Sequence, residues 1–362
     1  MILKTFGWAF GVTILALVGA LVVGGPGALA LVAILAVLEI SLSFDNAVVN
    51  ATVLERMNPF WQRIFLSVGI VIAVFGMRLI FPPVIVGLTA HLDPIAVVHK
   101  ALQGGAVETP GTYANLLHAA HPAIAAFGGM FLLMLFLDFV LEEREIAWLA
   151  WLERPLARVG RLDRVSTVVA LALLVIAAET WAHPYAATVL GSGAIGIGVY
   201  LLVDGLGDLF EQGGGLEEDE VAGRHPVQAF GKAAFFLFLY LEVLDASFSF
   251  DGVIGAFAIS QNIFIIAVGL GVGAMYIRSL TVYLVRKGTL GEYVYLEHGA
   301  MWAIGALAVI LLISIRSEVP EVITGLIGVG FIGLAFISSL VRRRRLPAAE
   351  SAVPRDDMEL NA

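Results

Sequence analysis

Two short acidic motifs, 206 residues apart, repeat the same order of residue types. The first is Glu39-Ile40-Ser41-Leu42-Ser43-Phe44-Asp45-Asn46, and the second is Asp245-Ala246-Ser247-Phe248-Ser249-Phe250-Asp251-Gly252. Glu242 places one more carboxylate about one helical turn before Asp245. Carboxylate, amide and hydroxyl oxygens are the ligands that Mn²⁺, Mg²⁺ and Ca²⁺ prefer, and they suit copper or a structural zinc site poorly. The motifs therefore predict binding of a hard divalent cation.

The chain around the motifs is strongly apolar. Hydrophobic residues make up 59% of its 362 residues and charged residues 14%, whereas charged residues make up about 25% of a soluble globular protein. Apolar runs of the roughly 20 residues that cross a bilayer recur along the chain. We therefore predict an all-α fold, a polytopic membrane helix bundle of about ten transmembrane helices. The predicted helices lie near residues 6–24, 28–54, 61–80, 122–141, 165–183, 186–209, 229–259, 262–285, 293–315 and 321–341.

Acids within such helices need compensation. An ionised side chain near the bilayer centre costs on the order of 2.5–3.5 kcal/mol, so the acids must be protonated, paired with cationic side chains or bound to a metal ion. Arg78 and Arg278 offer structural salt bridges, but two arginines cannot balance the five acids of the motifs. Further acids on other predicted helices are Asp138, Glu179, Asp204, Asp208 and Glu297. The surplus of negative charge predicts a bound cation.

The repeat extends beyond the motifs. Val68-Gly69 is followed nine residues later by Arg78, and Val268-Gly269 is followed nine residues later by Arg278. The first motif lies on the second predicted helix and the second motif on the seventh, so the two copies are expected to cross the membrane in opposite directions. Inverted repeats of this kind are typical of secondary transporters, which bind their substrate at the interface between the repeats and often on interrupted helices.

Helix geometry limits how the first motif can bind an ion. Glu39 and Asp45 are six residues apart, which places them about 120° apart around an α-helix and roughly 9 Å apart along it. Either the helix unwinds at Ser41–Phe44 so that both carboxylates converge, or each carboxylate faces a different partner. The residues that do share one helical face are Glu39, Ser43, Asn46 and Asn50.

Lysine and arginine indicate the orientation, because positively charged loops stay cytoplasmic. With ten helices nearly all of these residues fall on one side, and only Lys100 and Arg316 fall on the other. This places both termini in the cytoplasm of a multi-pass cell-membrane protein. The basic run Arg342–Arg345 follows the last apolar segment and is typical of a topology anchor, so no nucleic-acid partner is predicted. The lipid bilayer is a predicted partner, and the oligomeric state is left open.

The domain organisation follows from these helices. The predicted parts are a first transmembrane helix (1–27), a first repeat (28–141) with an extracytoplasmic loop at 81–121, connecting helices with an acidic cytoplasmic loop (142–228), a second, inverted repeat (229–341) and a cytoplasmic tail (342–362). The loop at 81–121 is interpreted either as a polar loop with a short interfacial helix or as a metal-collecting loop. Its candidate ligands are His91, Asp93, His99, Glu108, His118 and His121. His298 is interpreted either as an interior hydrogen-bonding residue or as a nitrogen ligand.

The motifs resemble the signature of the TerC family of integral membrane proteins. The stretch Glu39 to Ala47 is similar to the first copy of that signature, and the stretch from Leu241-Glu242 through Phe250-Asp251 is similar to its second copy. Tyr295-Leu296-Glu297-His298-Gly299-Ala300 resembles a longer bacterial branch of formerly unassigned function. The resemblance covers most of predicted helices two to ten. The family belongs with the LysE-type exporters, and its bacterial members are associated with manganese efflux, tellurite resistance or calcium.

The resemblance also implies which residues line the ion site. These are Glu39, Asp45 and Asn46 from the first motif and Asp245 and Asp251 from the second. Because the second copy has Gly252 where the first has Asn46, an amide ligand is either missing there or replaced by a backbone carbonyl, and Glu242 is expected to compensate. The complete predicted metal site is Glu39, Asp45, Asn46, Glu242, Asp245 and Asp251.

We therefore expect a secondary transporter that exports a divalent metal cation, with manganese preferred over calcium. The sequence contains no P-loop, so ATP-driven pumping by this chain is not expected. No enzymatic activity and no cofactor are predicted, and Mn²⁺ or Ca²⁺ is the transported ion. The main alternative is a membrane chaperone or scaffold whose intramembrane acids are structural. Gly205-Leu206-Gly207-Asp208 matches a short motif of intramembrane aspartyl proteases, but the Pro-Ala-Leu element that such enzymes also need is missing.

Overall fold

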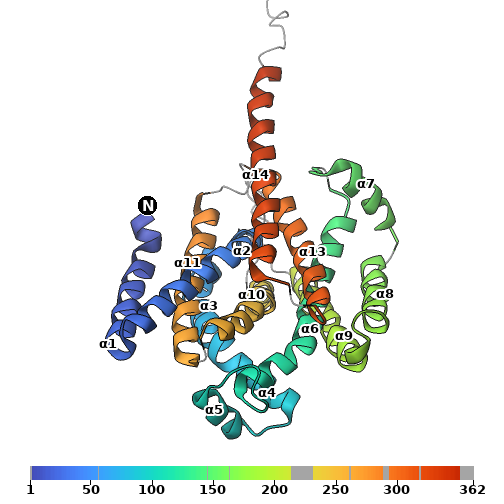
Figure 1. Cartoon of the computed structure of the whole chain (residues 1–362). Coiled ribbons are helices and arrows are strands. Elements are labelled where there is room, and N and C mark those ends of the chain that lie inside the picture. Colours follow the sequence, from blue (N-terminus) through green and yellow to red (C-terminus); the bar gives the residue numbers. More distant parts are fainter. Residues whose placement is uncertain are drawn as a thin grey trace, which may run out of the picture.

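The computed structural model is built from helices (Figure 1). It describes residues 2–55, 57–144, 146–162, 164–212, 231–260, 262–287, 293–317 and 319–350, and these residues contain no β-strand. The α-helices are α1 (Ile2–Leu42), α2 (Phe44–Glu55), α3 (Pro59–Val71), α4 (Phe81–Ala90), α5 (Pro94–Gln103), α6 (Tyr113–Leu141), α7 (Ala150–Val159), α8 (Val165–Glu179), α9 (Ala186–Gln212), α10 (Gly231–Ile259), α11 (Ile263–Lys287), α13 (Leu296–Ser314) and α14 (Glu321–Glu350). A π-helix, η1 (Ile72–Ile80), and a 3₁₀-helix, η2 (His183–Tyr185), complete the set. The predicted all-helical fold class is confirmed.

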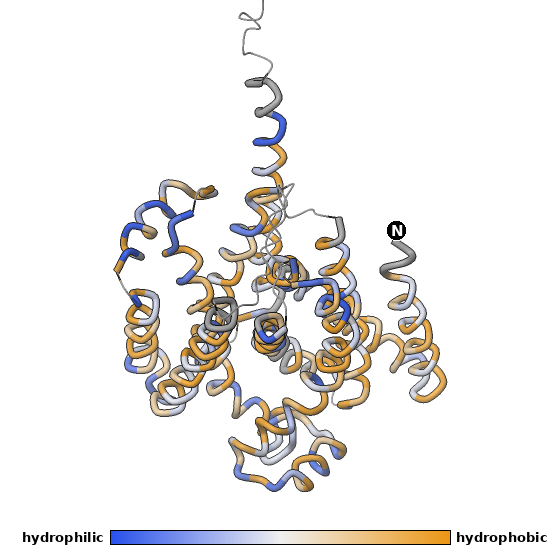
Figure 2. Tube along the Cα trace, turned by 180° about the vertical axis from the view of Figure 1, so that it is seen from behind, coloured by the Kyte–Doolittle hydropathy of each residue, from blue (hydrophilic) through white to orange (hydrophobic). Residues whose placement is uncertain are grey.

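Among the described residues, seven helical stretches are long and apolar enough to cross a membrane. They are Phe6–Ser41, Pro59–Ala90, Tyr113–Leu141, His183–Leu206, Ile263–Val285, Leu296–Ser314 and Ile323–Arg344. Large apolar side chains on them face outward, as Val23 (90% exposed) does on α1 and Leu326 (66% exposed) on α14. Figure 2 shows hydrophobic residues along most helices of the bundle. Soluble proteins rarely expose apolar surface on this scale, so the chain is a multi-pass membrane protein.

The first two predicted helices, 6–24 and 28–54, are arranged differently from the prediction. They are joined in α1, which is kinked at Gly25 (φ 72°, ψ −170°), directly before Pro26. Glycine adopts a positive φ without the steric cost of a side chain, and the chain changes direction there (Figure 1). The second predicted helix is itself divided, because α1 ends at Leu42 and α2 begins at Phe44.

The loop predicted over 81–121 is shorter than expected. The helix that contains α3, η1 and α4 continues to Ala90, and α6 already begins at Tyr113. Between them lies α5, the short helix predicted for this loop. Its N-cap is Asp93, whose carboxylate accepts hydrogen bonds from the backbone N–H groups of Ile95 and Ala96, both at 3.0 Å. One candidate metal ligand of the loop is therefore a helix cap.

Close packing around α6 relies on small residues. Most residues of α6 are buried, and the helix lies against α9 and α13. A Cβ atom built on Gly129 of α6 would lie 3.2 Å from Leu312 of α13, and one built on Gly196 of α9 would overlap the backbone of Phe127. Helices in membranes associate through such small residues, because these let the backbones approach closely.

The helices that carry the repeated residues pack against helices of the opposite half of the chain. In the first half, α1 lies along α11 of the second half, while α10 of the second half lies against α3 and η1 of the first half. The two motifs are therefore both placed in the region where the halves meet.

The packing of α9 on α6 leads to a prediction about two glycines of the same helix. We expect Gly196→Ala to destabilise the protein by about 1–3 kcal/mol, because the new methyl group overlaps Phe127 of α6. The matched change Gly198→Ala meets no atom within 4 Å and is expected to alter stability by no more than about 1 kcal/mol. Thermal unfolding of both variants in the same detergent checks this, and equal melting temperatures would contradict the packing described here.

Candidate functional site

The first motif lies where α1 ends and α2 begins. The interruption predicted within Ser41–Phe44 is found at Ser43, whose N–H donates to the carbonyl of Glu39 at 2.9 Å. The Ser43 hydroxyl also donates to Glu39 Oε1, at 3.1 Å. Glu39 is 3% exposed and forms an ion pair with Arg78, whose side chain is equally buried. The carboxylate that the sequence placed in the apolar interior is therefore compensated.

Arg78 reaches Glu39 from the π-helix η1. A π-helix is a rare local widening of the helical turn and often occurs at functional sites. Here Arg78 donates one guanidinium N–H to Glu39 Oε1 and another to the carbonyl of Ala73, five residues earlier in the same π-helix. Both bonds hold the guanidinium in one place within the bundle.

The second motif lies on α10, which is helical from Gly231 to Ile259 without the break found in the first motif. Glu242 and Asp245 are 5% and 7% exposed, and both pair with Arg278 of α11. Arg278 donates to Glu242 Oε1 at 3.0 Å, to Glu242 Oε2 at 3.2 Å and to Asp245 Oδ2 at 3.2 Å. Its guanidinium carbon also lies 4.0 Å from the ring centroid of Phe65. Bidentate pairing of this kind is stronger and more directional than a single hydrogen bond.

The ion pairs follow the sequence repeat. Glu39 of the first copy corresponds to Asp245 of the second, and Arg78 corresponds to Arg278. In each copy the arginine of the second helix therefore binds the acid of its own motif. Two guanidinium groups face three carboxylates, so one negative charge remains among these described side chains when all of them are ionised.

The two motifs meet at Glu39. A Cβ atom built on Gly252 of the second motif would lie 3.2 Å from Glu39 Oε2, and one built on Gly273 of α11 would lie 2.5 Å from Glu39 Cβ. Glu39 therefore fills a notch that two glycines of the second half leave open. The departure from the repeat agrees with this contact, because a side chain at position 252, such as the counterpart of Asn46, would press on the Glu39 carboxylate.

Charged side chains of the second half likewise lie against a glycine of the first half. A Cβ atom built on Gly69 of α3 would overlap Arg278 Nη1 and lie 2.8 Å from Glu242 Oε1. The charged groups of each half thus lie against a glycine of the other half.

Two buried amides on α2 belong to the same helical face. Asn46 and Asn50 are 4% and 1% exposed. The Oδ1 atom of Asn50 has no hydrogen-bond partner within the described part of the chain. A buried acceptor without a partner is costly, so Asn50 is a further candidate ligand. The sequence placed it on one face with Glu39 and Asn46 but did not include it in the predicted site.

The predicted metal site is only partly described. Glu39, Asn46, Glu242 and Asp245 are placed as above, whereas the side chains of Asp45 and Asp251 lie outside the described residues. Among the side chains that are described, no group of three or more His, Asp or Glu residues could hold a metal ion. The six-residue site therefore stays a prediction, and the described carboxylates are held by arginines.

The family model described as a protein of unknown function (DUF475) matches residues 44–346, which is most of the chain. The protein belongs to the DUF475 family. The matched part includes α2, η1, α10 and α11, and so contains both arginines and the whole second motif. No curated protein and no solved structure matches the chain. The DUF475 description names no function, so the resemblance to TerC proteins stays a prediction.

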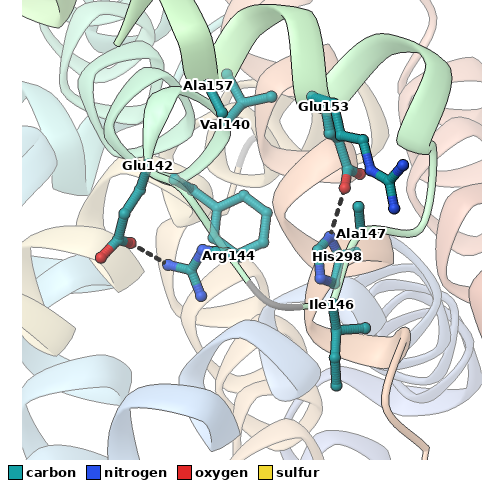
Figure 3. A pocket seen from close by; sticks show the side chains of 10 residues that line it. Val140, Glu142, Arg144, Ile146, Ala147, Glu153, Ala157 and His298 are labelled. Carbon is teal, nitrogen blue, oxygen red and sulfur yellow. Dashed lines mark hydrogen bonds and ion pairs between the residues drawn. The ribbon is translucent and has the colours of Figure 1, made fainter. Parts of the chain in front are cut away.

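His298 of this DUF475 member lies at a second polar site, where α7 rests on α13 (Figure 3). Its Nδ1 atom lies 3.1 Å from Oε2 of Glu153 on α7, and its ring meets Phe139 edge to face at 5.1 Å. These contacts favour the interpretation of His298 as an interior residue that lies against Glu153 and Phe139 over that of a nitrogen ligand. A small hollow of about 30 Å³ beside it is lined by Glu142, Arg144 and Glu153 among others.

Glu153 is the centre of this second site. It accepts hydrogen bonds from the backbone N–H of Trp148 at 3.0 Å and from the indole of Trp302 at 3.0 Å. Burial raises the pKa of the Glu153 carboxyl, but the interaction with His298 and the hydrogen bonds from Trp302 and the backbone of Leu149 outweigh burial, and the pKa falls to about 2. The carboxylate thus stabilises the fold above its ordinary pKa of 4.5, and this contribution is lost as the pH falls toward 2.

The bidentate pairing of Arg278 leads to a prediction about stability. We expect Arg278→Gln to destabilise the protein by about 3–5 kcal/mol, because it leaves two buried carboxylates without a positive charge. Adding Glu242→Gln and Asp245→Asn should restore most of the loss. Thermal unfolding in detergent measures both effects.

Arg316→Gln is the matched control, since Arg316 is exposed and is expected to change stability by no more than about 0.5 kcal/mol. If the triple variant is as unstable as Arg278→Gln alone, packing on Phe65 rather than charge explains the role of Arg278.

Proposed function

We propose that this membrane protein is a secondary transporter that exports a divalent metal cation, with manganese as its preferred substrate. The observation that carries the proposal is the meeting of the two motifs, in which the Glu39 carboxylate lies beside Gly252. Asp251 directly precedes Gly252 in the sequence and Asp45 belongs to the motif of Glu39, and the proposal assigns both carboxylates to the same cation site. A surplus of acids at the centre of a membrane protein is typical of a cation pathway.

The proposed architecture is ten membrane-spanning helices arranged as an inverted repeat. Gly25 divides α1 into two apolar arms, and α8 and α10 are further helices of 15 and 29 residues. The packing of α1 on α11 and of α10 on η1, each across the two halves, supports a pseudo-twofold relation between the halves. The N-terminal end of α1 and the C-terminal end of α14 lie at one end of the bundle, opposite α4 and α5 (Figure 1). An even number of membrane crossings requires both of these helix ends to lie on the same side of the membrane. The basic loops favour the cytoplasm as this side.

In this proposal the cation is the transported substrate, and its ligands are Glu39, Asp45, Asn46, Glu242, Asp245 and Asp251. Arg78 and Arg278 stabilise the carboxylates while no cation is bound. An entering cation then competes with the two guanidinium groups for the same oxygen atoms. Because Arg78 and Arg278 lie on η1 and α11, this competition links cation binding to the positions of these helices.

The alternative is a membrane scaffold or chaperone in which the acids are structural. The ion pairs of Glu39 with Arg78 and of Glu242 and Asp245 with Arg278 favour this interpretation, since each described acid of the two motifs already has a partner. It requires only hydrogen bonding and charge balance at the motifs, whereas transport requires anionic oxygen ligands. The choice of manganese over calcium as the substrate depends on the resemblance to the TerC family. The proposal includes no enzymatic activity and no cofactor.

The proposal predicts that Asp45→Asn and Asp251→Asn each abolish manganese export. Each change removes one anionic ligand but keeps the shape and the hydrogen-bonding capacity of the side chain. The measurement is manganese movement across vesicles that contain the purified variant, together with the manganese content of cells that express it at the parental level.

Asp93→Asn is the matched control. It makes the same substitution at the N-cap of α5, where asparagine is as good a cap as aspartate, and it is expected to transport like the parent. If both motif variants export manganese at the parental rate, these aspartates are not ligands and the scaffold alternative is favoured. Equal transport of calcium by the parent would keep the site but change the metal.

A further inference from the structure

The short helix α7 has an inner face that fixes its orientation on the bundle. Glu153 on this face binds Trp302 and lies against His298, as described above. Directly after α7, its C-cap Gly160 packs on the carbonyl oxygen of Leu141, where a Cβ atom would overlap it. The inner face is therefore attached at both ends of α7, and the opposite face must point away from the protein.

That outer face is apolar. Trp151, Val159 and Leu162 are 76%, 47% and 65% exposed, and Pro155 is exposed between them. At 100° per residue the three helical positions Trp151, Pro155 and Val159 fall within an arc of about 80° on one side of α7, and Leu162 follows beyond the end of the helix. Glu153 and Gly160 fall on the other side. Three apolar side chains of α7 thus form a stripe that the rest of the described chain does not cover, and the exposed Leu162 adds a fourth just after the helix.

Basic residues border the stripe along one flank, and the first of them, Arg154, also lines the hollow beside His298. Arg154 and Arg158 are exposed, and neither forms an ion pair with any residue that the structure describes. Arg161 lies in the turn just after α7 and is neutralised by Glu143, at 2.7 Å. The stripe is therefore accompanied by two positive charges that no described group balances.

The position of α7 in the chain places this face at the membrane surface. The membrane-spanning α6 ends at Leu141 and the apolar α8 begins at Val165, so α7 lies in the connection between them. The contact of Gly160 with Leu141 holds α7 at the level where α6 leaves the bilayer. Tryptophan prefers this interfacial depth, and an apolar stripe beside arginines is the pattern of a helix that lies in the plane of the interface.

We infer that the outer face of α7 binds anionic phospholipid headgroups, with its apolar stripe at the boundary of the acyl chains and Arg154 and Arg158 on the phosphates. The charge of the flank selects anionic over zwitterionic lipid. A second copy of the chain fits this face less well, because a twofold contact through the stripe would bring the arginines of both chains together. The inference is independent of the transported substrate.

The test uses the absence of cysteine from the natural sequence. A single Val159→Cys or Leu162→Cys substitution in the full-length protein carries an environment-sensitive fluorophore, and the protein is placed in vesicles of phosphatidylcholine with increasing phosphatidylglycerol. We expect the emission to shift to the blue as the anionic fraction rises, and the shift to weaken at high salt. A label at Leu102 on α5 reports general effects of lipid charge.

Arg154→Gln with Arg158→Gln should abolish the shift over the same range of lipid composition, since each arginine near an anionic surface strengthens binding by about fivefold. Arg161→Gln is the matched control, because Glu143 already neutralises that charge, and it should have a smaller effect. Melting temperatures confirm that each variant is folded. Emission at Val159 and Leu162 that stays water-like in phosphatidylglycerol overturns the inference. Efficient Val159→Cys cross-linking between copies in both lipids also overturns it, in favour of a contact between chains.

Discussion

The burial of acidic side chains in an apolar bundle is the constraint on which the centre of this protein depends. Glu39, Glu242 and Asp245 are each less than a tenth exposed, and all three form ion pairs with Arg78 or Arg278. Removing a guanidinium from such a pair leaves a charge in a medium of low dielectric constant, which costs far more than the pair itself contributes. The positions of η1 and α11 are therefore fixed by the reach of their arginines.

The backbone around these ion pairs is shaped to admit them. The π-helical turns of η1 let Arg78 bind the Ala73 carbonyl and Glu39 together, and Gly69 and Gly273 lack the side chains that would overlap Arg278 and Glu39. These glycines lie in the opposite half from the charged group that they admit. The same contacts that compensate the acids thus also hold the two halves together, so charge balance and helix packing cannot be altered separately.

Hydropathy and the repeat predicted much of this arrangement. The apolar runs located most helices to within a few residues, since a span must satisfy its backbone hydrogen bonds and expose apolar side chains to lipid. The charge of Arg78 and Arg278 suggested ion pairs, but the sequence could not decide which acid each arginine binds. The role of Gly252 depends on a contact between segments more than 200 residues apart in the chain, and Glu153 depends on the docking of α7, so neither could be read from local pattern. Asn50 could have been predicted as a candidate ligand, because helical spacing already placed it on the same face as Asn46.

The two halves are similar in sequence but unequal at the site, and the inequality bears on how a cation could enter. Arg278 holds two carboxylates through three hydrogen bonds, whereas Arg78 binds Glu39 through Oε1 alone. The Oε1 atom also accepts the Ser43 hydroxyl, which leaves Oε2 as the oxygen nearest to Gly252. Charge acts in the opposite direction, because Arg278 is shared by two carboxylates whereas Glu39 and Arg78 balance each other one to one. In the proposed transporter the surplus negative charge at Glu242 and Asp245 is therefore expected to attract the cation first, and the Oε2 atom of Glu39 is the oxygen of the first motif that it can then engage.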